Sequence, residues 1–285
     1  MARIAYILTL ACIGAGTQIA FAADGAGKPK IPVFAFTPNT GWVIDRRFGI
    51  DDLLPSPGGG PGPVTFDKAY PYRPNMPGQQ STYRVADLSN PILKDWLKPS
   101  MKRANDLVIA GMVPFRARER CWPVGVPGFD AYSWVEPFYF YERAKEIVVI
   151  NQGGPEIRHI YMNVPHSKNL KPTWYGESVG HYEGGDTLVI DTIGLNDRTF
   201  VDNYRTPHTT KLHVIERWKI APDLQTVDVS MSVDDPGAFT TPWTAVQRWR
   251  RVEDAPILQV PCNENNDDHF SQSLVPIAHA ETPDF

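Results

Sequence analysis

Short apolar or alternating runs, each ended by turn residues, fill the chain from Glu136 onward. With almost no helical periodicity between them, these runs predict a series of β-strands. The predicted strands are Pro137–Glu142, Glu146–Gln152, Ile157–Asn163, Val179–Glu183, Asp186–Thr192, Lys211–Ile220, Thr226–Val233 and Trp243–Val252, with a further candidate at Ile257–Val260.

The spacing of these runs predicts an antiparallel meander. A long row of strands must hide its two unpaired edges, and closing the sheet on itself does so. We therefore expect a mainly β fold, a lipocalin-like barrel or a strongly curved sheet, over residues 112–266. A tail over residues 267–285 follows this domain.

The sequence predicts one turn of the meander clearly. Glu183-Gly184-Gly185-Asp186 separates two strand-like segments. Glycine supplies the positive φ that a tight turn needs, and an aspartate side chain bonds back to the nearby backbone. We therefore expect a hairpin that turns at the two glycines, with Asp186 in a structural role.

A single helix is predicted over Pro91–Gly111. Asn90 can cap this helix and proline suits its first position, while Gly111 is a stop signal. Pro99 should kink or divide it, because proline has no amide hydrogen to donate. We expect the helix to pack on the barrel through one apolar face, formed by Leu93, Trp96, Leu97 and Met101.

The segment from residue 24 to residue 90 is rich in proline and glycine, most densely over Pro55–Pro63. Proline removes a backbone donor and glycine costs conformational entropy, so neither supports regular structure. We expect an irregular arm here.

The first residues have the order of a secretory signal. A positive charge at Arg3 precedes an apolar run, and Ala20-Phe21-Ala22 has the small-x-small pattern of a cleavage site. We expect residues 1–23 to be removed and the protein to be periplasmic or secreted in a bacterium. No later apolar run is long enough to span a bilayer, so we expect no integral membrane association.

Charge and cysteine content limit the partners and the compartment that this protein can have. The net charge is −4 and the chain has no polybasic cluster, which argues against nucleic acid as a partner. Of the three cysteines, Cys12 leaves with the signal, and Cys121 and Cys262 remain in an oxidising compartment. A disulfide between these two is predicted, and the alternative is two separate buried thiols that act as small apolar residues.

Several standard catalytic signatures are absent from the sequence. There is no glycine-rich dinucleotide or Walker motif, so no nucleotide cofactor is predicted. Gly176–Gly180 has the letters of a hydrolase nucleophile elbow, but it runs into a strand where a true elbow leads into a helix. The histidines lack the spacing of a dedicated metal site, and no metal is predicted.

Charged residues inside apolar strands are the first candidates for chemistry. Asp191, Glu216 and Arg217 must each face water, a partner or a cavity. Glu216 alternates with Val214 and Trp218 and so faces the apolar side of its strand. It either pairs with an arginine as a structural brace or lines a pocket. His213 and Arg217 share the other face of the strand.

Two loop histidines complete the predicted catalytic set. His166 and His208 each follow a proline, in loops that begin or end strands, where working residues are often found. Histidine is the natural acid or base near neutral pH, and Asp191 or Glu216 could orient it. Substrate-binding roles are predicted for Tyr161, Trp174, Tyr175, Arg217 and Trp218.

From these residues we expect an exported lyase, isomerase or hydrolase that acts on a small, largely apolar or aromatic molecule in a barrel pocket. A second hypothesis is a lipocalin-like carrier or sensor that binds a hydrophobic ligand without chemistry. A third, metal or haem binding, depends only on the histidines.

Several motifs in order along the chain resemble a family of exported, mostly hypothetical bacterial proteins. They are Arg158–Met162, Pro165-His166, Pro172–Gly180 with its continuation to Asp191-Thr192, Pro207-His208-Thr209 and Cys262–Asn266. The resemblance implies an exported, β-rich protein and implies no activity. The turn at Gly184-Gly185 is one glycine longer than in the family, which could bulge the hairpin.

Overall fold

The computed structural model describes residues 40–48, 53–70, 84–112, 114–115, 117, 121–131, 137–151 and 156–258. The predicted signal, Cys262 and the tail over residues 267–285 lie outside the described residues, so the cleavage and the disulfide stay predictions. Ile257 and Leu258 are described and belong to no strand; the rest of that candidate strand also lies outside.

Nine strands close into a barrel, because the first strand pairs with the last. Each barrel strand hydrogen-bonds to the next barrel strand along the chain. The short β2 (Leu54–Pro55) pairs with Ala245 and Val246 of β10. The predicted fold class is therefore confirmed. The barrel strands are β1 Gly41–Ile44, β3 Phe138–Glu142, β4 Glu146–Asn151, β5 Glu156–Met162, β6 Glu177–Glu183, β7 Thr187–Ile193, β8 His213–Ile220, β9 Thr226–Asp234 and β10 Trp243–Val252.

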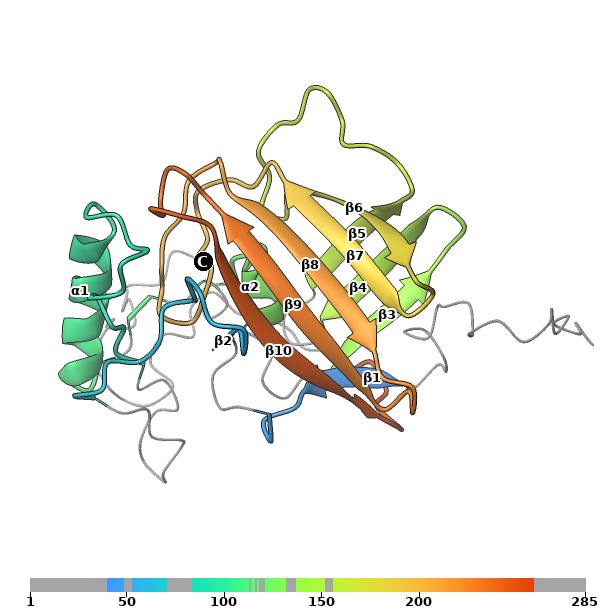
Figure 1. Cartoon of the computed structure of the whole chain (residues 1–285), viewed down its shortest axis with the longest axis horizontal. Helices are drawn as coiled ribbons and strands as arrows, with labels where there is room; N and C mark the ends of the chain where they lie inside the picture. The colour runs from blue at the N-terminus through green and yellow to red at the C-terminus, as the bar shows by residue number, and fades with distance from the viewer. Residues whose placement is uncertain are drawn as a thin grey trace, which may run out of the picture.

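One pair departs from the antiparallel meander that the spacing predicted. β5 and β6 run parallel, with Ile160 opposite Ser178. Parallel neighbours cannot be joined by a hairpin, so the chain must travel back along the barrel before β6 begins. Residues 163–176 make this return, which we call the crossover segment. It is the long yellow-green loop above β5 and β6 in Figure 1.

The predicted hairpin is present between β6 and β7. Gly184 and Gly185 have φ of +59° and +79°, which glycine adopts without steric cost. Strand pairing is continuous from Glu177 opposite Ile193 to Glu183 opposite Thr187. Both glycines are therefore accommodated in the turn, and the ladder between β6 and β7 has no bulge.

The barrel interior is filled by aromatic and aliphatic side chains. Buried and more exposed positions alternate along β5, β8 and β9, as the pleat requires. Trp249 lies 4.4 Å from Phe138 and 5.5 Å from Trp218, measured between ring centroids. The short helix α2 (Gly128–Ala131) adds Phe129, which is 1% exposed and contacts Phe138 edge to face.

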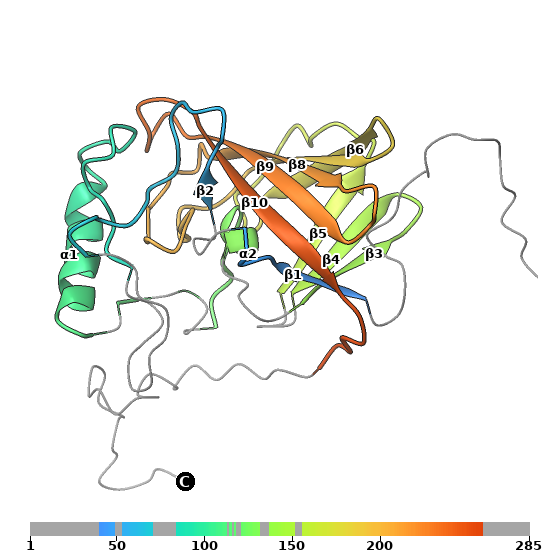
Figure 2. The ribbon, with the colours of Figure 1, turned by 60° about the horizontal axis from the view of Figure 1, so that its bottom comes forward.

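The prediction of an irregular arm over residues 24–90 is wrong for Gly41–Ile44. This strand, β1, joins β10 to β3 and so closes the barrel, as Figure 2 shows where β1 crosses beside β10. Trp42 is 1% exposed and belongs to the core. A run of four residues between proline-rich stretches carries little strand signal of its own. Its two neighbours supply the hydrogen bonds that define it.

The predicted helix begins later than expected. Helix α1 spans Lys98–Ile109, and Pro99 lies in its first turn, where proline needs no hydrogen bond. No kink is therefore required. Asn90 accepts a hydrogen bond from the Ile92 amide and so stabilises a turn, and Trp96 is 51% exposed. The helix does end where Gly111 predicted, with φ of +79° at that glycine.

Helix α1 stands beside the loops at one end of the barrel (Figure 1). Asn105 holds it there, because its side chain donates to the Ala86 carbonyl and accepts from the Ala86 amide. Among the described residues, no helix has the length and apolar character of a membrane-spanning segment.

Candidate functional site

Two of the four predicted catalytic residues meet on the outer wall of the barrel. His166 lies in the crossover segment, and its Nε2 is 3.1 Å from Oδ1 of Asp191 on β7. Asp191 faces outward because it alternates with the buried Ile190 and Thr192. The crossover segment therefore brings a loop histidine onto a charge in a strand.

A second histidine joins the same carboxylate. His213, the first residue of β8, places Nε2 2.8 Å from Asp191 Oδ1. The other nitrogen of His166, Nδ1, is 3.0 Å from Oε1 of Glu177, the first residue of β6. We call His166, Glu177, Asp191 and His213 the histidine–carboxylate cluster.

Glu177 is the most constrained member of the cluster. It accepts hydrogen bonds from the Ser167 amide at 2.7 Å and from the Ser167 hydroxyl at 2.6 Å. Burial raises the pKa of Glu177, but the bonds from Ser167 and His166 outweigh it and hold the pKa below its ordinary value. Glu177 is therefore a stable anion that fixes His166.

Apolar side chains lie next to the cluster on the outer wall. Asp191 pairs with Val179 on β6 and with Ile215 on β8, and Val179 pairs with Tyr161 on β5. Paired residues point to the same face of a sheet. Tyr161, a predicted substrate-binding residue that is 44% exposed, therefore lies in the same row as Asp191.

Glu216 lies inside the barrel, away from the cluster. Both of its carboxylate oxygens bond to the guanidinium of Arg158 on β5, with Nη1 to Oε1 at 3.1 Å. Arg158 also donates to Thr192 at 2.9 Å and to Ser178 at 3.2 Å. Glu216 and Arg158 are 0% and 2% exposed. Of the two sequence-based alternatives for Glu216, the arginine brace is confirmed.

His208 lies in a third place, the loop that joins β7 to β8. Its Nδ1 faces the Thr209 carbonyl at 3.0 Å, and its Nε2 faces the Thr199 hydroxyl at 2.7 Å. A carbonyl can only accept, so Nδ1 carries the hydrogen and the neutral ring accepts from Thr199. Burial lowers the pKa of His208, against the Thr209 bond and two nearby aspartates. The structure does not bring His208 to the other predicted catalytic residues.

The same loop contains a buried aspartate with a pH-dependent contribution to stability. Asp202 accepts from the amides of Tyr204 and Thr206 and from the Thr206 hydroxyl. Burial raises the pKa of Asp202 from 3.8 to about 6, although these bonds lower it. The folded protein thus holds this proton more tightly than the unfolded chain. The Asp202 contribution is largest below pH 3.8 and is lost as the pH rises through about 6.

We expect Asp202→Asn to gain stability relative to the parent as the pH rises. The amide keeps the shape of the carboxyl but never has to bury a charge. Between pH 4 and pH 7.5 the difference in unfolding free energy should move in favour of the variant by about 2–3 kcal/mol. Urea unfolding of both proteins at the two pH values measures this shift. Parallel pH profiles would contradict it.

The remaining predicted substrate-binding residues are dispersed. Trp218 is 2% exposed in the core and donates to Glu216, while Arg217 faces outward and pairs with Glu183. Trp174 contacts Trp122 at 5.5 Å in a group of loop aromatics, and Tyr175 packs on Phe129. Only Tyr161 lies in the row of the cluster.

The carrier hypothesis and the metal hypothesis concern the barrel interior and the histidines. Buried core side chains occupy the described part of the barrel interior. A cavity of about 890 Å³ lies on the outer wall, and four arginines are among its lining residues. Within the described residues, no group of histidines, cysteines and carboxylates has an arrangement suited to a metal ion.

Known proteins do not point to a function: no family model, no curated protein and no solved structure matches this chain.

Three charged or titratable residues of these networks were missed at the level of sequence: Glu177, His213 and Arg158. His213 was placed on a strand face without a partner, yet the register sets it diagonally beside Asp191 on the same face. Arg158 interrupts an apolar strand and shares its inward face with Ile160. That position was a signal that it could be the buried partner of Glu216.

Proposed function

We propose that this protein is an exported enzyme that moves a proton by general acid–base chemistry, with His213 as the group that exchanges it. The observation that carries the proposal is the pairing of His213. Its Nε2 is held by Asp191, and no described residue bonds to its Nδ1. A partly exposed imidazole with one fixed and one open nitrogen is suited to accept and return a proton.

The hydrogen-bond partners assign the proton positions in the cluster. A carboxylate only accepts, so the His213 nitrogen that faces Asp191 carries its hydrogen. In the neutral ring the lone pair then lies on Nδ1, which is the open nitrogen. Asp191 holds His213 in this tautomer, the role that a carboxylate has beside a catalytic histidine.

His166 supports the site and is a positioning residue in this proposal. Both of its nitrogens face carboxylate oxygens, of Glu177 and Asp191, so neither is open to a substrate. Its contact keeps the Asp191 oxygen directed at His213. His166 and Asp191 thus keep the catalytic relevance that the sequence predicted, while the proton-exchanging role moves to His213.

The surroundings favour a small, largely apolar or aromatic substrate. Val179 and Ile215 flank Asp191 on the outer wall, and Tyr161 follows Val179 in the same row. Hydration or dehydration, isomerisation and hydrolysis each need a positioned acid or base and no nucleotide cofactor. The predicted signal supports a site of action in the periplasm or outside the cell.

The same contacts also tie the crossover segment to the barrel. Ser167 and His166 together hold Glu177, so part of the cluster serves stability. His213 does not contact the crossover segment through any described hydrogen bond, and its loss should affect chemistry alone. This difference separates a catalytic cluster from a structural one.

The test compares His213→Gln with Ser167→Ala. Parent and variants are screened for hydrolysis of aryl esters and for deuterium uptake from D₂O by small ketones, which reports proton abstraction. We expect His213→Gln to lose activity by about 10²-fold or more with unchanged stability. Ser167→Ala should lose stability and retain turnover when folded.

Two results would sink the proposal. Equal turnover by His213→Gln and the parent would remove His213 from the chemistry. If the parent binds compounds of the panel and transforms none, the carrier hypothesis takes its place. Long-range ¹H–¹⁵N spectra check the tautomers independently, with a bare Nδ1 expected at His213.

A further inference from the structure

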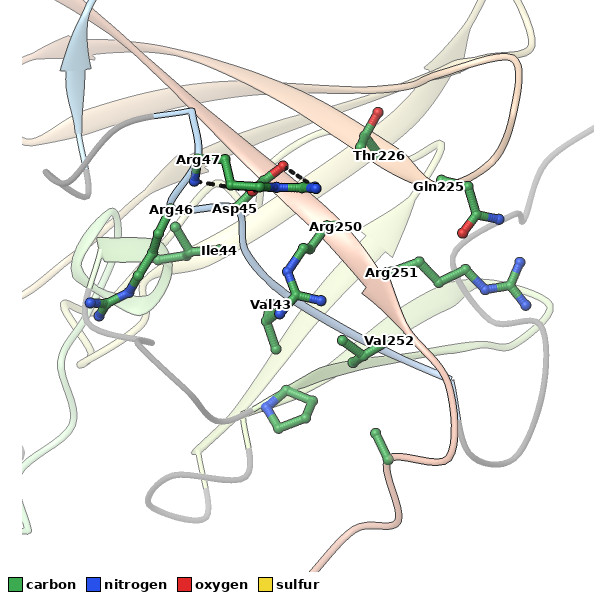
Figure 3. A pocket seen from close by; sticks show the side chains of 12 residues that line it. Val43, Ile44, Asp45, Arg46, Arg47, Gln225, Thr226, Arg250, Arg251 and Val252 are labelled. Carbon is green, nitrogen blue, oxygen red and sulfur yellow. Dashed lines mark hydrogen bonds and ion pairs between the residues drawn. The ribbon is translucent and has the colours of Figure 1, made fainter.

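A cavity of about 890 Å³ lies on the outer wall of the barrel, where β1 pairs with β10 (Figure 3). None of the residues of the histidine–carboxylate cluster lines it. We call it the arginine cavity. Its lining consists of Val43, Ile44, Asp45, Arg46, Arg47, Pro137, Gln225, Thr226, Arg250, Arg251, Val252 and Ala255.

The strand register places one arginine centrally in this cavity. Arg250 pairs with Val43 on β1 and with Thr226 on β9, so the three side chains form one row on the outer face. Figure 3 shows the Arg250 guanidinium directed toward Val43. Arg46 and Arg251 lie on opposite sides of it in this view.

The charges of the lining are unbalanced. Four of the lining residues are arginines, and Asp45 is the only carboxylate among them. Asp45 is already bound by Arg47, with Nε to Oδ1 and Nη2 to Oδ2 both at 2.8 Å. Arg251 pairs with Glu253 at 2.7 Å.

Arg250 has no such partner. No carboxylate of the described residues lies within ion-pair distance of its guanidinium, and the side chain is exposed. The protein as a whole carries a net charge of −4, so this concentration of cations is a local feature of one wall. An excess of one sign of charge in a cavity raises the local concentration of the opposite ion.

The remaining lining is apolar and adjoins Arg250. Val43 and Val252 lie beside it on the two paired strands, and Pro137 and Ala255 complete the edge. An inorganic anion would leave these side chains uncovered. A ligand that fits the whole lining needs an anionic group and an apolar body.

We infer that the arginine cavity binds a small organic carboxylate with an apolar or aromatic body, with Arg250 as the residue that pairs with the carboxylate. The guanidinium offers two parallel N–H donors that match the two oxygens of a carboxylate. Val43, Val252 and Pro137 cover the body of the ligand. This site is separate from the proposed proton-transfer site and does not depend on it.

The probe is naphthoate, and its uncharged analogue naphthylmethanol is the control ligand. Titration calorimetry on the mature full-length chain should show saturable naphthoate binding that weakens with added salt. Naphthylmethanol should bind at least tenfold more weakly. We expect Arg250→Gln to reduce the affinity for naphthoate by about 10- to 100-fold, the loss typical of a charged hydrogen bond.

Arg248→Gln is the matched control. Arg248 lies two positions away on the same outer face of β10, but it pairs with Asp228 and does not line the cavity. Its loss should leave naphthoate binding unchanged. A second variant, Thr226→Asp, puts a carboxylate opposite Arg250 on β9 and should block binding without removing any arginine.

Three results would overturn the inference. One is the absence of saturable binding of naphthoate and of dodecanoate to the folded parent. Another is equal affinity of the parent and Arg250→Gln. The third is displacement of naphthoate by inorganic phosphate with the same efficiency as by dodecanoate. This would show that the ligand does not use the apolar lining. His213→Gln should bind naphthoate as the parent does, which keeps this test distinct from that of the enzyme.

Discussion

Glu216→Gln should destabilise the protein by about 3–5 kcal/mol, because it removes the carboxylate that pairs with the buried Arg158 guanidinium. The amide keeps the shape of the carboxylate but can accept through one atom only. Arg158 is 2% exposed and cannot turn to water within the packed interior. With total stabilities of about 5–15 kcal/mol for ordinary domains, such a loss is readily measured by urea unfolding.

Arg217→Gln is the internal control for this prediction. Arg217 is the next residue on β8 and also forms an ion pair, with Glu183, but that pair is on the outer wall and both side chains are nearly half exposed. Water and salt screen such a pair, so its loss should change stability much less. If Arg217→Gln and Glu216→Gln lower the free energy of unfolding equally, the charge of the interior ion pair does not contribute the stability predicted here.

The double variant Arg158→Met with Glu216→Leu tests whether the ion pair stabilises the protein by more than the cost of burying its two charges. Removing both charges leaves neither member of this ion pair buried without the other, and the Ser178 and Thr192 hydroxyls still bond to each other at 2.8 Å. We expect the double variant to be more stable than Glu216→Gln. A double variant that is less stable would show that the ion pair contributes more than the cost of burying it.

Trp249→Ala should cost about 3–5 kcal/mol and open a cavity in the barrel. Trp249 is 0% exposed, its ring contacts Phe138 and Trp218, and its indole donates to Gln247. It also lies on the strand that closes the barrel, opposite Ile44 on β1 and Val227 on β9. Neighbouring side chains can therefore fill the space only in part.

A dry cavity of this kind should bind a small aromatic molecule. Indole is expected to raise the unfolding temperature of Trp249→Ala and to leave that of the parent unchanged. The control is Trp96→Ala, because Trp96 is 51% exposed and makes its hydrogen bond to the Gly237 carbonyl at the surface. If indole stabilised the parent to the same degree, this would favour the hypothesis of a lipocalin-like carrier.

Local pattern predicted most of the strands, and the reason is physical. Alternation of buried and exposed residues is a property of each strand by itself, so runs such as Trp243–Val252 could be recognised one at a time. The hairpin at Gly184-Gly185 was equally local, because the requirement for positive φ resides in the two glycines. Glu216 could be assigned to the apolar face of β8 on the same basis.

The pairing of distant segments was beyond local pattern. β1 is a strand because β10 and β3 bond to it, and Gly41–Ile44 by itself resembles the rest of the arm. Arg158 and Glu216 are far apart in the chain and meet only because both point into the closed barrel. Helix α1 begins at Lys98 because the preceding residues are bound elsewhere, Leu93 to Phe239 among them.

The candidate site divides in the same way. The sequence by itself determined that Asp191 was a charge in an apolar strand and that His166 was a histidine in a loop, since both facts concern immediate neighbours in the chain. Only the tertiary structure decided that His166 and His213 share one oxygen of Asp191 and that His208 is buried elsewhere. The parallel pairing of β5 with β6 requires a crossover along the outer wall, and that crossover carries His166 to Asp191.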